Sequence, residues 1–336
     1  MTVIYAILIF CLLIFVHELG HFIVAKACGV KVNEFALGMG PAIFKKQKGE
    51  TLYALRILPV GGYCKMEGED EDSEEPRAFN NQPAWQRACV LAAGSVMNLI
   101  TCVILLIVIA FWVGTSTTTI NEVMDDSPAQ KAGIVSGDTI VQVDGEEINE
   151  WDDLIQALGY NENDRAKITV DRDGEEITLT ADLEYDKDTG RKMIGITPTT
   201  EHKPGKAVIG GIKNTGSMTV MMYTILKQLF TGEVAVKELS GPVGIVYATN
   251  QAAKSGFMYV IYLTALLSLN LAIINMLPFP ALDGGRLLFL VIRLFTGKRV
   301  SDETEGKIHF IGICLLFALM IYVTFNDVIR FIIPIF

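Results

Sequence analysis

Hydrophobic residues occur along this chain in four long runs that few charged residues interrupt. A helix needs about 20 apolar residues to cross the hydrocarbon core of a bilayer, and each run is long enough. The pattern therefore predicts a polytopic α-helical membrane protein with four transmembrane helices. The four runs are Val3–Ala25, Ala88–Gly114, Phe257–Leu282 and Ile308–Asn326.

The stretch between the second and third runs has short alternating segments instead. Gly137–Ile148 contains a turn, a short strand and a tight Asp-Gly hairpin. Asp152–Leu158 then has a helical pattern, and Ala166–Val170 and Ile177–Ala181 have strand patterns around the turn Asp173-Gly174. We expect a compact α+β domain here. A later apolar stretch, Ala207–Phe230, is interrupted by Gly and Lys and predicts an amphipathic connector helix at the outer surface rather than a fifth span.

Charge is segregated in the same way. The chain is 51% hydrophobic and 20% charged, with a net charge of −10. Between Asn121 and Thr200, 20 acidic residues stand against 7 basic ones, a net of −13, so the rest of the chain is close to neutral. Such a negative domain argues against nucleic acid as a partner.

Basic residues in the loops predict the orientation. Lys26–Arg87 carries nine of them and Arg293–Lys307 carries four, and segments rich in Lys and Arg stay in the cytosol. We therefore expect a multi-pass protein of the cell membrane, with these two segments cytosolic and with both termini and the acidic domain outside.

The sequence His17-Glu18-Leu19-Gly20-His21 lies near the cytosolic end of the first run. Positions i and i+4 share a helix face, so His17 and His21 can bind one Zn²⁺ while Glu18 reaches a water molecule beside it. Three ionisable groups within a membrane span are costly unless they share a role. The alternative is a helix end with two interfacial histidines and a snorkelling glutamate.

A catalytic zinc site needs a third protein ligand. Cys11 and Cys28 lie too far along the helix axis from the histidines, and His309 opens the fourth run. Asp283 remains as the candidate within the membrane. It follows two prolines and precedes two glycines, which break a helix, and such backbone is tolerated at membrane depth where it is buried or lines a wet cavity.

The motif His17–His21, the later sequence Asn275–Gly285 (N-x-x-P-x-P-x-L-D-G-G) and the intervening domain together resemble the bacterial site-2 protease family, in particular its RseP-like members. The resemblance implies that His17, His21 and Asp283 bind zinc and that Glu18 is the general base. It also implies that the acidic domain is a PDZ domain and that the enzyme cleaves transmembrane segments of substrates. The expected domains are residues 1–116, 117–200 and 201–336.

The same resemblance assigns substrate contacts. Asn270 and Asn275 are similar to family asparagines that engage the backbone of an unwound substrate, although both amides could instead join helices. Gly94–Asn98 resembles a family G-x-x-x-N motif, for which we expect a packing role.

The cytosolic segment after the first run resembles the family's membrane-associated β-hairpin. We expect strands at Thr51–Leu58 and Tyr63–Met66, with Tyr53 beside an extended substrate, or else a hairpin that only shields the site. The run Glu67–Glu75 has seven carboxylates in nine residues and predicts a solvated, disordered linker.

These observations predict an intramembrane zinc endopeptidase that acts in the bilayer on single-span membrane proteins, which another protease has cut first. An inactive, membrane-anchored PDZ adaptor is the alternative, although it would need none of the four polar site residues. A metal transporter is disfavoured because the spans offer no polar path. The PDZ domain could bind cut termini or act as a size filter.

Overall fold

The computed structural model describes residues 2–69, 73–159, 161–186, 190–296 and 302–333. The chain forms two compact units. The first, here called the membrane unit, combines Met1–Ile107 with Gly211–Phe336, and the second, the inserted unit, is Val108–Gly210. The domain expected at residues 117–200 lies within the inserted unit.

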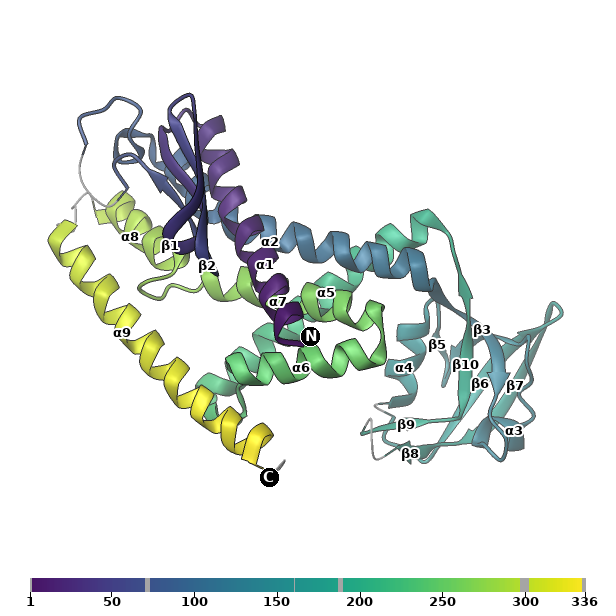
Figure 1. The fold of residues 1–336 in the computed structure, drawn as a ribbon. Helices are drawn as coiled ribbons and strands as arrows, with labels where there is room; N and C mark the ends of the chain where they lie inside the picture. Colours follow the sequence, from purple (N-terminus) through teal and green to yellow (C-terminus); the bar gives the residue numbers. More distant parts are fainter. Residues whose placement is uncertain (1, 70–72, 160, 187–189, 297–301, 334–336) are drawn as a thin grey trace. The chain divides into compact units, whose positions relative to one another are not determined.

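Four of the described helices are long and apolar enough to cross a membrane. Each coincides with one of the predicted runs, so all four runs are helical, as their pattern predicts. They are α1 (Thr2–Ala27), α2 (Ala84–Val113), α7 (Phe257–Asn275) and α9 (Asp302–Asp327) (Figure 1).

The third of these helices is shorter than expected. α7 ends at Asn275 instead of Leu282, and a new helix, α8, covers Asp283–Thr296. The two prolines between them cannot donate to a helical ladder and disfavour helical backbone in the preceding residue. Ala281 in this loop has a positive φ of 79°. Asp283 is therefore the first residue of a separate helix.

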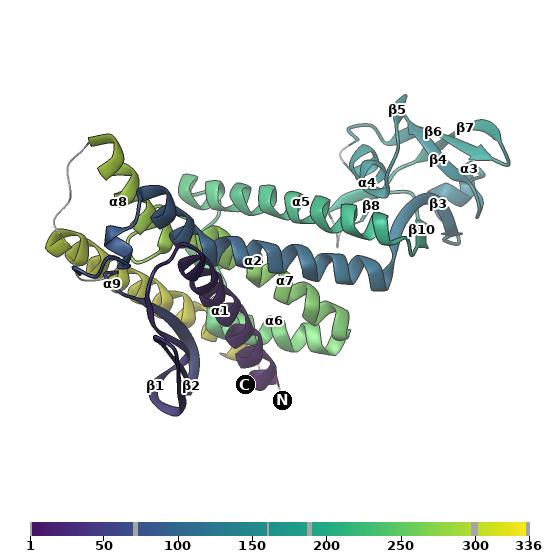
Figure 2. The same ribbon diagram turned by 90° about the horizontal axis from the view of Figure 1, so that it is seen from above.

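Two other helices belong mainly to the membrane unit. α5 (Pro204–Thr231) covers the expected connector and is not among the candidate spans. It runs beside α2 in Figure 2, and a Cβ on Gly211 would lie 2.4 Å from the side chain of Ile107. α6 (Pro242–Ser255) begins where the buried Asp327 carboxylate accepts the N–H groups of Gly241 and Gly244, which caps its N-terminus.

A long hairpin of β1 (Val32–Lys48) and β2 (Thr51–Met66) follows α1. Both expected strands belong to β2, whereas β1 was not predicted because Gly and Pro punctuate it. Residues 34–37 have partners in both halves of β2, so β2 passes β1 twice. A core with residues from α1, the hairpin, the segment before α2, α2 itself and α8 holds the hairpin against the helices: Ala25, Val30, Val32, Phe35, Cys64, Met66, Phe79, Val90, Leu91 and Leu290.

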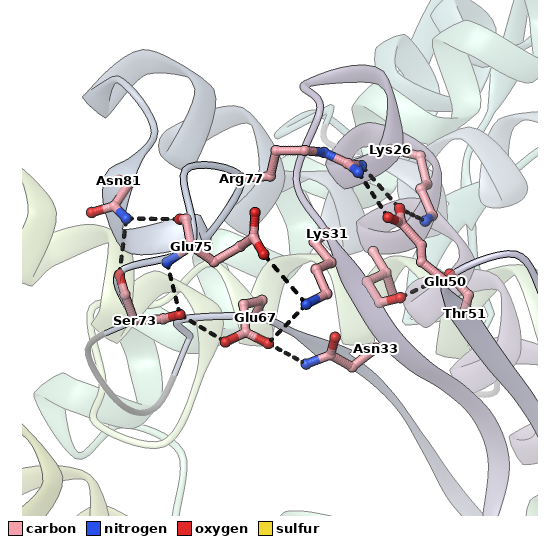
Figure 3. Close-up of polar contacts among 11 residues, drawn as sticks. Lys26, Lys31, Asn33, Glu50, Thr51, Glu67, Ser73, Glu75, Arg77 and Asn81 are labelled. Carbon is pink, nitrogen blue, oxygen red and sulfur yellow. Dashed lines mark hydrogen bonds and ion pairs between the residues drawn. The ribbon is translucent and has the colours of Figure 1, made fainter.

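The acidic segment after the hairpin is ordered where it is described, so the prediction of a disordered linker is wrong there. Glu67 accepts a hydrogen bond of 2.8 Å from Asn33, and Lys31 lies 3.8 Å from Glu67 and 3.6 Å from Glu75 (Figure 3). The high density of carboxylates predicted a solvated segment, but Lys31, just before β1, pairs with both Glu67 and Glu75. Residues 70–72 lie outside the described part.

Glu50, at the hairpin turn, joins the hairpin to the end of α1. Its carboxylate accepts from Arg77 at 2.7 and 2.9 Å and from Lys26 at 2.6 Å (Figure 3). The hydrogen bonds from Arg77 and then Lys26 lower the pKa of Glu50 to about 2. This carboxylate therefore stays ionised and bound throughout the physiological pH range.

The inserted unit is built on an antiparallel sheet in the order β10-β3-β4-β6-β7, with β5 paired to β4 and a separate pair β8-β9. Helices α3 and α4 complete it, and one cluster of buried aliphatic side chains forms its core. The elements are β3 (Thr115–Val123), α3 (Pro128–Ala132), β4 (Thr139–Val143), β5 (Glu146–Glu147), α4 (Trp151–Gly159), β6 (Arg165–Arg172), β7 (Glu175–Asp182), β8 (Glu184–Asp186), β9 (Arg191–Met193) and β10 (Ile196–Glu201).

The expected hairpins, helix and strands of this unit are confirmed at β4 to β7. β3 and β10 were missed because they are rich in Thr and lack a clear alternation of apolar residues. Within the unit, Asp138 is fully buried and accepts from Val135 N–H at 2.9 Å and from Arg172 at 2.7 and 2.8 Å. Burial raises the pKa of Asp138, but the hydrogen bonds from Arg172 and Val135 outweigh burial and hold it below its ordinary value.

We predict that Asp138→Asn destabilises the inserted unit by about 2–3 kcal/mol at pH 7, because a buried ionic acceptor is lost. Since the folded pKa is lowered, the contribution is complete above the unfolded pKa of about 3.9 and is lost as pH falls through the folded value. Pulse proteolysis of the whole chain in denaturant measures it. Asp182→Asn, which removes an exposed pair with Arg165, should cost less than about 0.5 kcal/mol. Equal effects of the two substitutions would contradict this.

Candidate metal centre and active site

The two histidines of the first helix face the same side of α1, as their spacing predicts. Both side chains are buried, and their Nε2 atoms lie 3.2 Å apart. Glu18, next to His17, points toward the hairpin, where the backbone N–H of Cys64 donates to its carboxylate. The motif therefore separates a pair of nitrogen donors from a carboxylate on the adjacent side of the helix.

Asp283 joins the histidines from the start of α8. Its Oδ2 lies 3.1 Å from His17 Nε2 and 3.4 Å from His21 Nε2. Gly284 and Gly285 permit this placement, because a Cβ on either residue would lie 2.3 Å from a carbonyl oxygen of the preceding loop. The sequence suggested only that Asp283 and the two histidines lie at a similar depth in the membrane. In the structure, their side chains are in direct contact.

These three atoms have the geometry of a metal site. Zinc bonds of about 2.0–2.2 Å place tetrahedral neighbours about 3.3–3.5 Å apart, close to the separations of the three atoms. Among the described residues, His17, His21 and Asp283 are the one group of three side chains that could hold a metal ion. Asp283 Oδ2 is buried and has no hydrogen-bond donor within the described part of the chain, as expected of an atom that binds a cation.

The second nitrogens of the two imidazoles fix their orientation. His21 Nδ1 donates to the carbonyl of Val90 at 2.8 Å, which leaves the lone pair of Nε2 directed at Asp283. His17 Nδ1 lies 3.2 Å from the side-chain amide of Asn98, and the backbone carbonyl of Asn98 accepts a hydrogen bond from Ser268 Oγ at 2.8 Å. A 180° rotation of the Asn98 amide lets its buried Oδ1, otherwise without a donor among the described residues, accept from His17 Nδ1–H.

Asn98 therefore has a role beyond the packing that we expected of the G-x-x-x-N motif. Gly94, at the start of that motif, has an equally direct role. A Cβ on Gly94 would lie 2.4 Å from His21 Nε2 and 2.6 Å from the ring of His17. The backbone of α2 thus forms one wall of the candidate metal centre. In the sequence, Gly94 was the residue that could have indicated this close approach.

A cavity of roughly 530 Å³ opens beside the centre. Its walls come from α1, the second half of β2, the acidic segment, α2, the loop before α8, the start of α8, and α9. They include Glu18, His21, Tyr63, Cys64, Lys65, Met66, Glu69, Leu91, Ala281, Leu282, Asp283, Arg286, His309 and Ile313. The site therefore has space for a substrate backbone and water next to both the metal ligands and Glu18.

The three expected substrate-binding residues lie in different surroundings. Asn275 is next to the centre, with its amide 3.3 Å from His17 Nε2. Asn270 lies further back along α7, and its Oδ1 is buried without a donor among the described residues. Tyr53 packs in an aromatic cluster with Phe22 and Phe35, so Tyr63 lines the cavity in its place. A contact of Tyr53 with substrate stays a prediction.

The chain is also similar to solved structures of PDZ domains. The PDZ domain of an SdrC-like protein from Listeria innocua is 27% identical, covers 26% of this chain and 97% of its own, and has a TM-score of 0.23. The corresponding domain from Listeria monocytogenes is 26% identical with a TM-score of 0.22.

Comparisons over the whole chain are more extensive. The family described as Peptidase family M50 matches residues 5–319. A protein of Clostridium acetobutylicum, provisionally named a zinc metalloprotease, is 40% identical over 98% of this chain and 97% of its own. The regulator of sigma-W protease RasP of Bacillus subtilis is 33% identical, with 98% of each chain covered. The chain therefore belongs to peptidase family M50, the site-2 proteases, and is a zinc metalloprotease.

Proposed function

We propose that this chain is an intramembrane zinc endopeptidase that hydrolyses peptide bonds in the transmembrane segments of membrane proteins. The observation that carries the proposal is the contact of His17, His21 and Asp283 between apolar helices, with Glu18 at the same cavity. The substrates are single-span proteins that another protease has cut first, such as anti-sigma factors or signal-peptide remnants. The name of the Bacillus relative, a regulator of sigma-W, supports the first class.

Each site residue has a distinct task in this proposal. His17 Nε2, His21 Nε2 and Asp283 Oδ2 hold the zinc ion. The ion, when bound, acts as a Lewis acid on the scissile carbonyl and makes water more acidic. Glu18 accepts the proton of the attacking water and passes it to the leaving amine. Asn98 and the carbonyl of Val90 keep both imidazoles in the tautomer that binds metal.

The substrate must be extended before its carbonyl can reach the centre, which frees backbone groups in a dry environment. Asn270 and Asn275 supply amides for such groups. The second half of β2 pairs with β1 along one edge and borders the cavity, so its other edge can add an extended substrate strand. The PDZ domain binds the cut terminus or excludes substrates that have not been cut.

We predict that Glu18→Gln keeps its zinc but cleaves a co-expressed single-span substrate about 10²–10⁴-fold more slowly, because the proton acceptor is lost. Metal analysis and immunoblotting of the substrate measure the two effects. Glu233→Gln, at an exposed position outside the site, should cleave like wild type. Persistent cleavage by Glu18→Gln, or a parent protein without zinc, would refute the proposed function.

Gly94→Ala tests the metal centre from the other helix. Alanine favours a helix over glycine by about 1 kcal/mol, so α2 itself should not weaken. The new methyl group nevertheless overlaps both imidazoles, and we expect the purified protein to lose most of its zinc. Gly216→Ala, in α5 with no atom near the new Cβ, should retain full zinc. Equal zinc contents of the two variants would show that α2 does not border the metal.

For the orientation, we propose that the hairpin is cytosolic and the inserted unit is outside the cell membrane. In a chain whose six cysteines are replaced, a cysteine at the exposed position 164 should react with an impermeant thiol reagent on intact cells. A cysteine at the exposed position 45, on the hairpin, should react after the cells are opened. The reverse pattern would invert the proposed topology.

A further inference from the structure

The loop that carries Asp283 is held by the last membrane helix at two points. His309 and Gly312, one turn apart on α9, both contact the segment Pro280–Ala281. From the sequence alone, we excluded His309 as the third metal ligand because it lies at the start of the fourth apolar run. The proposed function gives this residue no role. Its contacts show what it does to the metal-binding loop.

The first contact fixes a backbone conformation that a non-glycine residue rarely adopts. Ala281 has φ of 79°, in the left-handed region where a Cβ is unfavourable. Its N–H donates to His309 Nδ1 at 2.9 Å. Because Ala281 lies two residues before Asp283, its backbone direction sets where α8 begins and where the carboxylate points. The hydrogen bond compensates for the strain.

The second contact brings the helix backbone against the same loop. A Cβ on Gly312 would lie 2.5 Å from the carbonyl oxygen of Pro280, so only a glycine allows α9 to approach this closely. A loop held by a side-chain hydrogen bond on one turn and by backbone contact on the next has little freedom to move the ligand that it carries.

The imidazole of His309 is itself fixed. It is 16% exposed, its ring centroid lies 5.7 Å from that of Phe289 in α8, and its Nε2 lies 3.8 Å from the Glu305 carboxylate. Since the N–H of Ala281 donates to Nδ1, the proton of the neutral ring is on Nε2, on the side of Glu305. His309 is not part of the group of possible metal ligands found among the described residues.

We infer that His309 is a positioning residue for the metal centre: it holds the Asp283 loop, through Ala281, in the conformation that binds zinc. This inference rests on the proposed function. It adds α9 to the elements that determine metal affinity, although α9 supplies no ligand.

Two substitutions of His309 separate the effect of its hydrogen bond from the effect of its ring. His309→Phe keeps a ring against Phe289 but removes the acceptor, whereas His309→Asn loses the ring but keeps an oxygen near the position of Nδ1. We expect His309→Phe to weaken zinc binding about 10–100-fold in competition with a chelator, and His309→Asn to bind close to wild type. In the metal-free proteins, the backbone amides of residues 276–284 should exchange with deuterium faster in His309→Phe than in wild type, and at the wild-type rate in His309→Asn.

Excess zinc gives a second readout, since mass action should restore cleavage by His309→Phe if its defect is metal affinity. Gly312→Ala should show the same loss of affinity through the other contact. Phe310→Ala, at an exposed position between them, is the matched control and should resemble wild type.

Wild-type affinity and exchange in His309→Phe would overturn the inference, as would an equal loss in Phe310→Ala. A wild-type protein that binds no zinc would instead refute the proposed function.

Discussion

The contact of His17, His21 and Asp283 places three polar groups among helices whose other faces are apolar. Such groups are costly in a bilayer unless each finds a partner, so the elements around them are arranged to supply partners. α2 provides the carbonyl of Val90 and the amide of Asn98, and α7 provides Asn275. Asp283 Oδ2 and the two Nε2 atoms remain as the candidate ligand atoms for a metal ion.

These partners can lie so close only because the helix backbones approach one another at positions where a side chain larger than that of glycine would keep them apart. Gly20 allows α1 to meet the carbonyl of Ala93, and Gly94 receives both imidazoles. Gly284 allows the loop to turn back over the start of α8, and Gly312 admits α9. In a membrane, where apolar burial between helices provides little drive, close packing of this kind supplies much of the association. The glycines that hold the helices together thus also shape the metal centre.

The parts of this arrangement that depend on local pattern could be predicted from the sequence. The His17–His21 spacing, the four apolar runs and the helix break before Asp283 each follow from composition or periodicity. The role of Asn98 could not, because G-x-x-x-N has the same pattern whether its side chains pack or bind. β1 was missed for a related reason: its glycines and proline indicate loops, and its pairing with distant residues of β2 overrides that preference.

The acidic segment shows why charge alone misleads about order. Its carboxylates have the composition of a solvated linker, yet Glu67 and Glu75 both pair with Lys31, just before the hairpin, and Glu69 pairs with Arg286. Arg286 is in the first turn of α8, three residues after Asp283, and both it and Glu69 line the cavity. The wall that the acidic segment forms is therefore held by ion pairs, whereas the helices around the candidate ligands approach one another through close contacts at glycines. Glu18 lines the same cavity, so this wall borders the carboxylate that accepts the proton of the attacking water in the proposed function.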